Sequence, residues 1–82
     1  MKPIGKITHY YDKAGVAIVE LADSLKVGDK IKIESGKNEF NQTVEEIQID
    51  HKMVSSAGSG DVVGIKVNQK IREGALVIKL AE

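Results

Sequence analysis

The chain has 82 residues, with 12 Lys and Arg against 12 Asp and Glu, two His, no Cys and 41% apolar residues. A chain of this length excludes a large enzyme, and the lack of cysteine excludes disulfides, thiolate nucleophiles and Cys-based zinc sites. The balanced charge excludes the strongly basic composition of non-specific nucleic-acid binders, although a local patch is still allowed. No apolar run approaches the ~18 residues of a membrane span, and the first residues open no signal peptide, so we expect a cytoplasmic protein with no membrane partner.

The apolar residues alternate with polar ones in short blocks separated by Gly, Asp, Asn and Ser, which is typical of an antiparallel all-β fold. The first predicted strand covers residues 4–11. The second, residues 16–21, is apolar on nearly both faces, so we expect a central strand with cover on each side. The third, residues 30–34, alternates most regularly and is expected to bury Ile31 and Ile33.

The fourth predicted strand, residues 40–50, changes its apolar phase. Phe40 and Val44 lie at even positions, whereas the two isoleucines that follow lie at odd positions, so a regular strand cannot bury all four. We therefore expect a bulge or bend near residues 45–46. Such kinks allow a small sheet to curl.

The last two predicted strands follow a glycine-rich loop at residues 55–61. They are expected to bury Val63, Ile65 and Val67 in residues 62–67, and Leu76, Ile78 and Leu80 in the final strand. Six short strands leave exposed edges unless the sheet closes. The predicted fold is therefore all-β: residues 1–82 form a single domain, a closed six-stranded antiparallel β-barrel.

The order of segments along the chain resembles a known domain. GVAIVEL, LKVGDKIKI, FNQTVEEIQI, SGDVVGIKV and REGALVIKL follow one another as in the second, β-barrel domain of elongation factor Tu and related translation GTPases. The motifs that carry the resemblance are Val27-Gly28-Asp29, the Gly-acidic segment at residues 59–64, and Arg72-Glu73-Gly74. The sequence has no GxxxxGK[ST] phosphate loop, so the resemblance implies no GTP binding.

A closer resemblance is to small stand-alone translation elongation factor-like proteins, and to barrel domains attached to collagenase-like peptidase relatives linked to tRNA modification. Residues 6–11 and 46–51 carry it. It implies a non-catalytic module without a cofactor that binds RNA, either tRNA or a ribonucleoprotein, or docks on a translation or tRNA-modification protein. The alternative is a protein-interaction subunit that supplies the barrel in trans to a peptidase-like tRNA-modification enzyme.

The residues themselves indicate two candidate contact regions. Rings of an aromatic cluster at residues 9–11 could stack on an unpaired base while lysines contact phosphate, or could simply pack at a barrel end. Basic residues near the last hairpin could contact phosphate, or could belong to an ordinary mixed-charge surface. The candidate binding surface is His9, Tyr10, Tyr11, His51, Lys66, Lys70 and Arg72.

Other motifs indicate structure rather than chemistry. The spacing of His9 and His51 supports neither a metal site nor a proton-transfer pair. A phosphate-binding loop at residues 55–61 would need a following helix, but residues 62–67 have the pattern of a strand. Adjacent carboxylates at residues 45 and 46 point to opposite faces of a strand. We therefore expect no catalytic and no metal-ligating residues.

Overall fold

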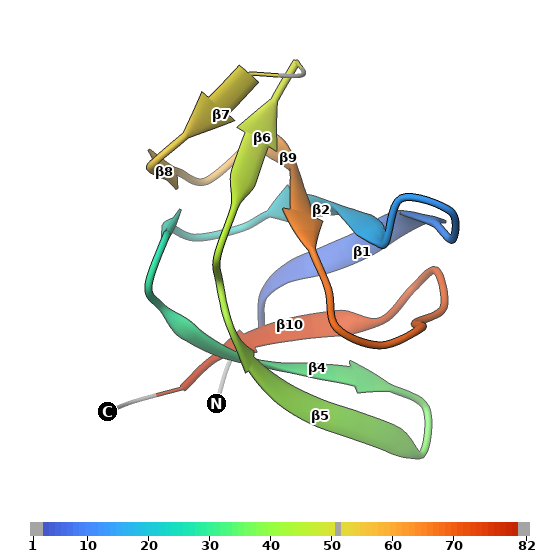
Figure 1. The fold of residues 1–82 in the computed structure, drawn as a ribbon. Coiled ribbons are helices and arrows are strands. Elements are labelled where there is room, and N and C mark those ends of the chain that lie inside the picture. Colours follow the sequence, from blue (N-terminus) through green and yellow to red (C-terminus); the bar gives the residue numbers. More distant parts are fainter. Residues whose placement is uncertain (1–2, 51, 81–82) are drawn as a thin grey trace.

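The computed structural model describes residues 3–50 and 52–80, and these form ten β-strands (Figure 1). The strands are β1 (Pro3–Tyr11), β2 (Val16–Leu21), β3 (Leu25–Lys26), β4 (Lys30–Ser35), β5 (Asn38–Thr43), β6 (Ile47–Ile49), β7 (Lys52–Val54), β8 (Ser56–Ala57), β9 (Val62–Lys66) and β10 (Leu76–Lys79). Eight of them form one antiparallel sheet in the order β5-β4-β10-β1-β2-β9-β6-β7, and β3 pairs with β8. The predicted all-β antiparallel class is confirmed. Within the described ranges, no helix is long and apolar enough to cross a membrane.

The long strand predicted over residues 40–50 is divided by a bend. β5 pairs with β4 and β6 pairs with β9, while residues 44–46 between them belong to neither strand. Val44 and Ile47 are both buried, at 1% and 0% exposure, so the apolar phase changes across the bend as predicted. In Figure 1 the chain rises from β5 at the bottom of the view to β6 at the top. The bend thus joins one end of the sheet order to a strand near the other end.

The predicted six-stranded closed barrel is not confirmed, because the backbone hydrogen bonds between the described strands do not close the sheet. The physical reason is the bend, which takes the chain away from β4 before it pairs with β9. A side chain bridges the resulting gap between β5 and β9, which we call the seam. The Gln42 Nε2 atom donates a hydrogen bond to the Lys66 carbonyl at 2.8 Å, and Gln42 Oε1 accepts one from the Asn68 N–H at 3.0 Å.

The core lies inside the curved sheet and is formed by the inward side chains of its strands. The predicted inward positions in β4 and β9 are confirmed, since Ile31, Ile33, Val63 and Ile65 are at most 1% exposed. The largest fully buried side chains are Ile7, Leu25, Ile31, Ile33, Ile47, Ile65, Val19, Val44, Val63 and Val77. Burial of this apolar surface is the main source of stability in a chain without disulfides.

The phase predicted for the final strand is wrong. Val77 is fully buried and pairs with Ile33 of β4, so Val77 faces the core. Leu76 and Leu80 are only partly buried. Ile78 is buried as predicted, at 7% exposure, but it pairs with Lys32 and lies outside the core cluster. Residues 75–78 are all apolar and show no alternation, so pairing with β4 decides which of them face the core.

Candidate functional site

The aromatic cluster predicted as a binding surface is divided between the two faces of β1. Tyr10 packs against the core, whereas Tyr11 is 51% exposed. The His9 and Tyr11 ring centroids lie 4.8 Å apart at 60°, and His9 Nδ1 lies 2.9 Å from Glu73 Oε2 on the surface. A β-bulge between Ile7 and His9 sets this arrangement. Tyr10 is thus a packing residue, and His9 and Tyr11 remain available to a ligand.

The structure brings together only two of the predicted basic residues. Lys70 and Arg72 lie in the loop between β9 and β10 and line the same cleft, which Lys66 on β9 does not line. The Lys70 Nζ atom also lies 3.8 Å from Asp12 Oδ2 on the surface. His51, the remaining candidate, lies outside the described residues.

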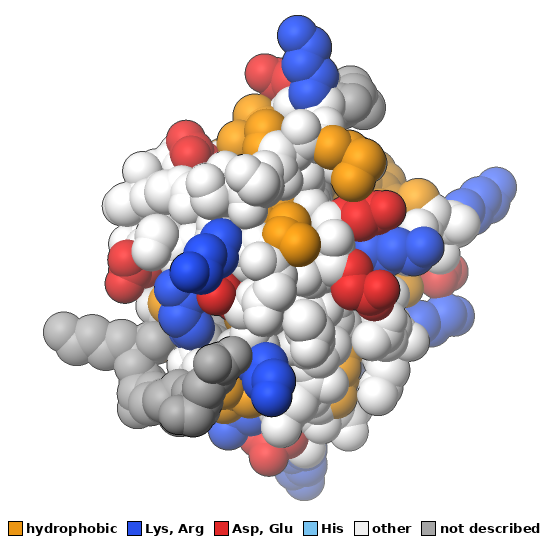
Figure 2. Space-filling view, turned by 60° about the vertical axis from the view of Figure 1, so that its left-hand side comes forward, with side chains coloured by type: hydrophobic (Ala, Val, Ile, Leu, Met, Phe, Trp, Pro, Cys, Tyr) orange, Lys and Arg blue, Asp and Glu red, His pale blue; other side chains and the backbone are white. Residues whose placement is uncertain are grey.

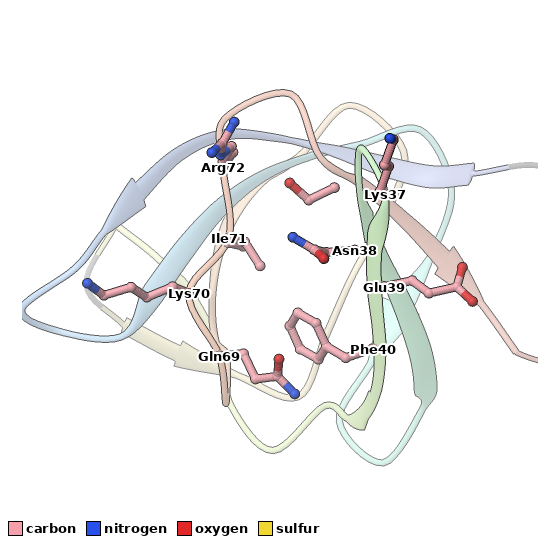
Figure 3. A pocket seen from close by; sticks show the side chains of 9 residues that line it. Lys37, Asn38, Glu39, Phe40, Gln69, Lys70, Ile71 and Arg72 are labelled. Carbon is pink, nitrogen blue, oxygen red and sulfur yellow. The ribbon is translucent and has the colours of Figure 1, made fainter.

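Lys70 and Arg72 belong to a cleft of about 600 Å³ between the β4–β5 turn and the loop that precedes β10 (Figure 3). We call it the hairpin cleft. Asn38, Phe40 and Ile71 point into its opening, and Lys37 lies across it from Arg72 (Figure 3). Its size falls in the range of ligand pockets. Its lining is mostly polar, with Phe40 and Ile71 as the apolar side chains among nine lining residues.

The charges around the hairpin cleft are mainly positive. Glu39 also lines it, but the Glu39 side chain points away from the opening in Figure 3 and its Oε2 lies 3.6 Å from Lys32 Nζ. Lys37 and Arg72 lie on opposite sides of the opening, and Glu39 is the one acidic residue among those that line the cleft, whereas the Lys70 side chain points away from the opening (Figure 3). Sequence analysis did not predict Lys37 and Phe40 as cleft residues. Lys37 lies in a connection between two predicted strands, Phe40 has the pattern of a strand residue that packs on the core, and only folding places them beside Arg72.

The acidic residues of the motifs that resemble translation factors hold turns. Asp29 Oδ2 accepts a hydrogen bond from the Lys26 N–H at 3.0 Å and lies 3.4 Å from Lys79 Nζ. Asp61 Oδ2 accepts a hydrogen bond from the Gly58 N–H at 2.9 Å. Within the loop predicted at residues 55–61, Ser56–Ala57 instead form β8, and residues 58–61 form a hydrogen-bonded turn, as the composition indicated. Asp29 and Asp61 are thus engaged in contacts that hold the fold.

The surface charge is otherwise mixed. Figure 2 shows Lys and Arg side chains interspersed with Asp and Glu over the face that it presents, and hydrophobic side chains gathered in its upper part. Across residues 3–50 and 52–80, no group of three or more His, Cys, Asp or Glu side chains is placed to hold a metal ion.

Comparison with known proteins relates the chain to a protease sequence. No protein-family model matches the chain. An uncharacterized protease of Methanocaldococcus jannaschii is 42% identical over 81 residues. This match covers 96% of the chain but only 20% of that protein, so the chain spans one fifth of the length of its relative.

Two solved structures have the same fold. One is the C-terminal domain of a candidate U32 peptidase of Geobacillus thermoleovorans, with a TM-score of 0.91 and 19% identity over 98% of this chain and 93% of that chain. The other is its selenomethionine variant, with a TM-score of 0.90 and 21% identity over 96% of this chain and 100% of that chain. Together with the protease sequence, these findings agree with the predicted resemblance to peptidase relatives. They do not extend to stand-alone elongation factor-like proteins.

Proposed function

We propose that this chain is a non-catalytic β-module that acts together with a peptidase-like enzyme. The observation that carries the proposal is the 42% identity with one fifth of the Methanocaldococcus jannaschii protease. A segment that forms one fifth of such a protein corresponds to an added module rather than to its whole catalytic machinery. The fold supports the same assignment, because it is that of a C-terminal domain in the Geobacillus thermoleovorans protein.

The geometry of the polar residues supports a binding role. Asp29 and Asp61 are engaged in turns, and the exposed His9 is paired with Glu73. Catalysis by a carboxylate or imidazole needs a group held at a substrate site and left with a proton to transfer. Asp29 and Asp61 instead hold turns, and His9 lies on an open surface. We further propose that the module is a protein-interaction subunit. It binds, as a separate chain, to a peptidase-like enzyme of the kind linked to tRNA modification.

Affinity capture from the cells that make this protein tests the proposal. The tagged chain is used as bait, with and without RNase, and the retained proteins are identified by mass spectrometry. We expect an RNase-resistant partner whose sequence is similar to the four fifths of the Methanocaldococcus jannaschii protease outside the matched segment. Retention of only RNA-dependent proteins, or of none with that similarity, would refute the proposed function.

RNA binding is the second candidate function, and the hairpin cleft is the observation that favours it. The Phe40 ring beside the rim cations Lys37 and Arg72 is suited to stack a base while the cations contact phosphate. Binding of a labelled single-stranded oligoribonucleotide should then weaken with salt and with Arg72→Glu. Lys66→Glu is the matched control, because Lys66 carries the same charge outside the cleft. Equal effects of the two substitutions would contradict binding in the cleft.

A further inference from the structure

The outer face of β2 is apolar although it lies on the solvent side of the curved sheet. β2 lies in the middle of the sheet, between β1 and β9. Ala17 and Val19 face the core and are fully buried, whereas Val16 and Ile18 alternate with them and are only partly buried. A strand that is apolar on both faces is typical of a sheet covered on both sides. Among the described residues, the core covers the inner face, and Val16 and Ile18 on the outer face are only partly buried.

The outward side chains of β2 belong to a groove of about 450 Å³. We call it the outer groove. Its apolar part is formed by Tyr11, Val16, Ile18, Val62 and Gly64, and Gln48 and Asp50 line it as well. Gly64 lies beside β2 on β9, where an added Cβ would lie 3.2 Å from Val16 Cγ1 and 3.5 Å from Ile18 Cδ1. Because Gly64 has no side chain, the side chains of Val16 and Ile18 extend over the outer face of β9 at this position. They form a low apolar floor there.

Two exposed hydrophobic side chains stand at the ends of this floor. Tyr11 pairs with Val16, and Val62 pairs with Glu20. Because Val16 and Glu20 are four residues apart on β2, Tyr11 and Val62 are separated by about 13 Å along the strand direction. They are 51% and 53% exposed. Asp50 lines the groove, and Glu20 and Lys66 flank it as the cross-strand partners of Val62 and Val16, so its polar surroundings carry charges of both signs. An apolar centre with a polar rim is the composition of a protein interface, whereas nucleic acid selects a surface of one sign.

We propose that the outer groove is the surface through which this chain docks on its peptidase-like partner. This inference rests on the proposed function and names the contact that the function requires. The occupant follows from the comparison with the Methanocaldococcus jannaschii protease, since 80% of that polypeptide lies outside the segment that corresponds to this chain. A protein that corresponds to this remaining 80% is large enough to pack against the apolar outer face of β2.

A matched pair of valines tests the docking surface. Val62 is 53% exposed in the outer groove, and Val27 is 43% exposed in the turn before β4, so neither substitution buries a charge. Val62→Asp also places a carboxylate opposite Glu20, and we expect this repulsion between exposed groups to leave the protein folded. The probe is the captured partner, identified by its similarity to the protease outside the matched segment, and the readout is its dissociation constant. We expect Val62→Asp to raise the dissociation constant at least tenfold and Val27→Asp to change it less than twofold. Thermal unfolding verifies that both variants remain folded.

Photo-crosslinking gives a second, independent readout. A benzoylphenylalanine placed at position 62 should crosslink to the peptidase-like protein, and the same group at position 27 should not. Equal dissociation constants for the two aspartate variants, or crosslinking from position 62 to a second copy of this chain, would overturn the assignment of the groove while leaving the proposed function intact. If the unaltered chain retains no peptidase-like protein, the proposed function fails and the docking surface fails with it.

Discussion

Replacing Gln42 with methionine tests whether the seam between β5 and β9 is held by a side chain. Gln42 is 8% exposed and is the one buried polar side chain among the described residues. Its amide joins the Lys66 carbonyl at 2.8 Å and the Asn68 N–H at 3.0 Å. Methionine has a similar length and flexibility but makes neither hydrogen bond, so the substitution removes the polar contacts while retaining much of the packing.

The expected loss of stability follows from these two contacts. A typical hydrogen bond contributes about 0.5–1.5 kcal/mol net to the free energy of unfolding, so the pair contributes about 1–3 kcal/mol. Both partners belong to the backbone around the end of β9, and without Gln42 they must find water instead. Because the seam is partly buried, we expect the loss to fall within this range rather than near zero.

Urea denaturation of the two proteins measures this loss. The free energy of unfolding should fall by about 1–3 kcal/mol with an unchanged dependence on urea. The Asn68 amide should also exchange its hydrogen about tenfold faster or more. Gln48→Met is the control, because Gln48 is half-buried in β6 and forms no side-chain hydrogen bond with any described residue. A loss below about 0.5 kcal/mol for Gln42→Met, or an equal loss for the control, would refute this account of the seam.

Three further substitutions test the packing and the surface by the same denaturation assay. Ile33→Ala should cost about 2–4 kcal/mol, because Ile33 is fully buried and truncation leaves a cavity. Gly5→Ala should cost about 1–3 kcal/mol, because the new Cβ would lie 2.6 Å from a methyl group of a buried valine, whereas Gly58→Ala, with nothing within 4 Å, should change stability by less than about 0.5 kcal/mol. His9→Ala should cost less than about 1 kcal/mol, because its contact with Glu73 is more than half exposed on both sides.

Each of these predictions has an outcome that contradicts it. A cost below about 1 kcal/mol for Ile33→Ala would mean that β4 does not face the core as described. Equal stability of Gly5→Ala and Gly58→Ala would mean that the close approach of β1 to β2 relaxes without strain. A cost above about 2 kcal/mol for His9→Ala would show that this surface contact holds the loop before β10.

Local sequence patterns determined most of the strands. The alternation in residues 30–34 predicted the strand and its buried face, and Ile31 and Ile33 are fully buried. The phase change between Val44 and Ile47 predicted the bend, because period-two geometry cannot bury both on one face without a break. These features depend on neighbouring residues alone, so they can be predicted without knowledge of strand pairing.

Strand pairing decided what the local pattern left open. Residues 75–78 are apolar throughout, so only the register of Val77 with Ile33 determines which side chain enters the core. The role of Gln42 likewise depends on a partner 24 residues away along the chain. An isolated glutamine in a strand gives no sign that it bridges two strands.

The hairpin cleft and the outer groove likewise combine features that the sequence predicts with contacts that only the fold provides. The sequence predicted that Lys70 and Arg72 could act together, and it predicted a second apolar face on residues 16–21. Only the tertiary structure separates Lys66 from the hairpin cleft and brings Lys37 and Phe40 into it. Only strand pairing places Gly64 beside Ile18, and so opens the outer groove. Amino-acid order determines which side chains are apolar or charged, whereas contacts between distant strands determine which of them share a surface.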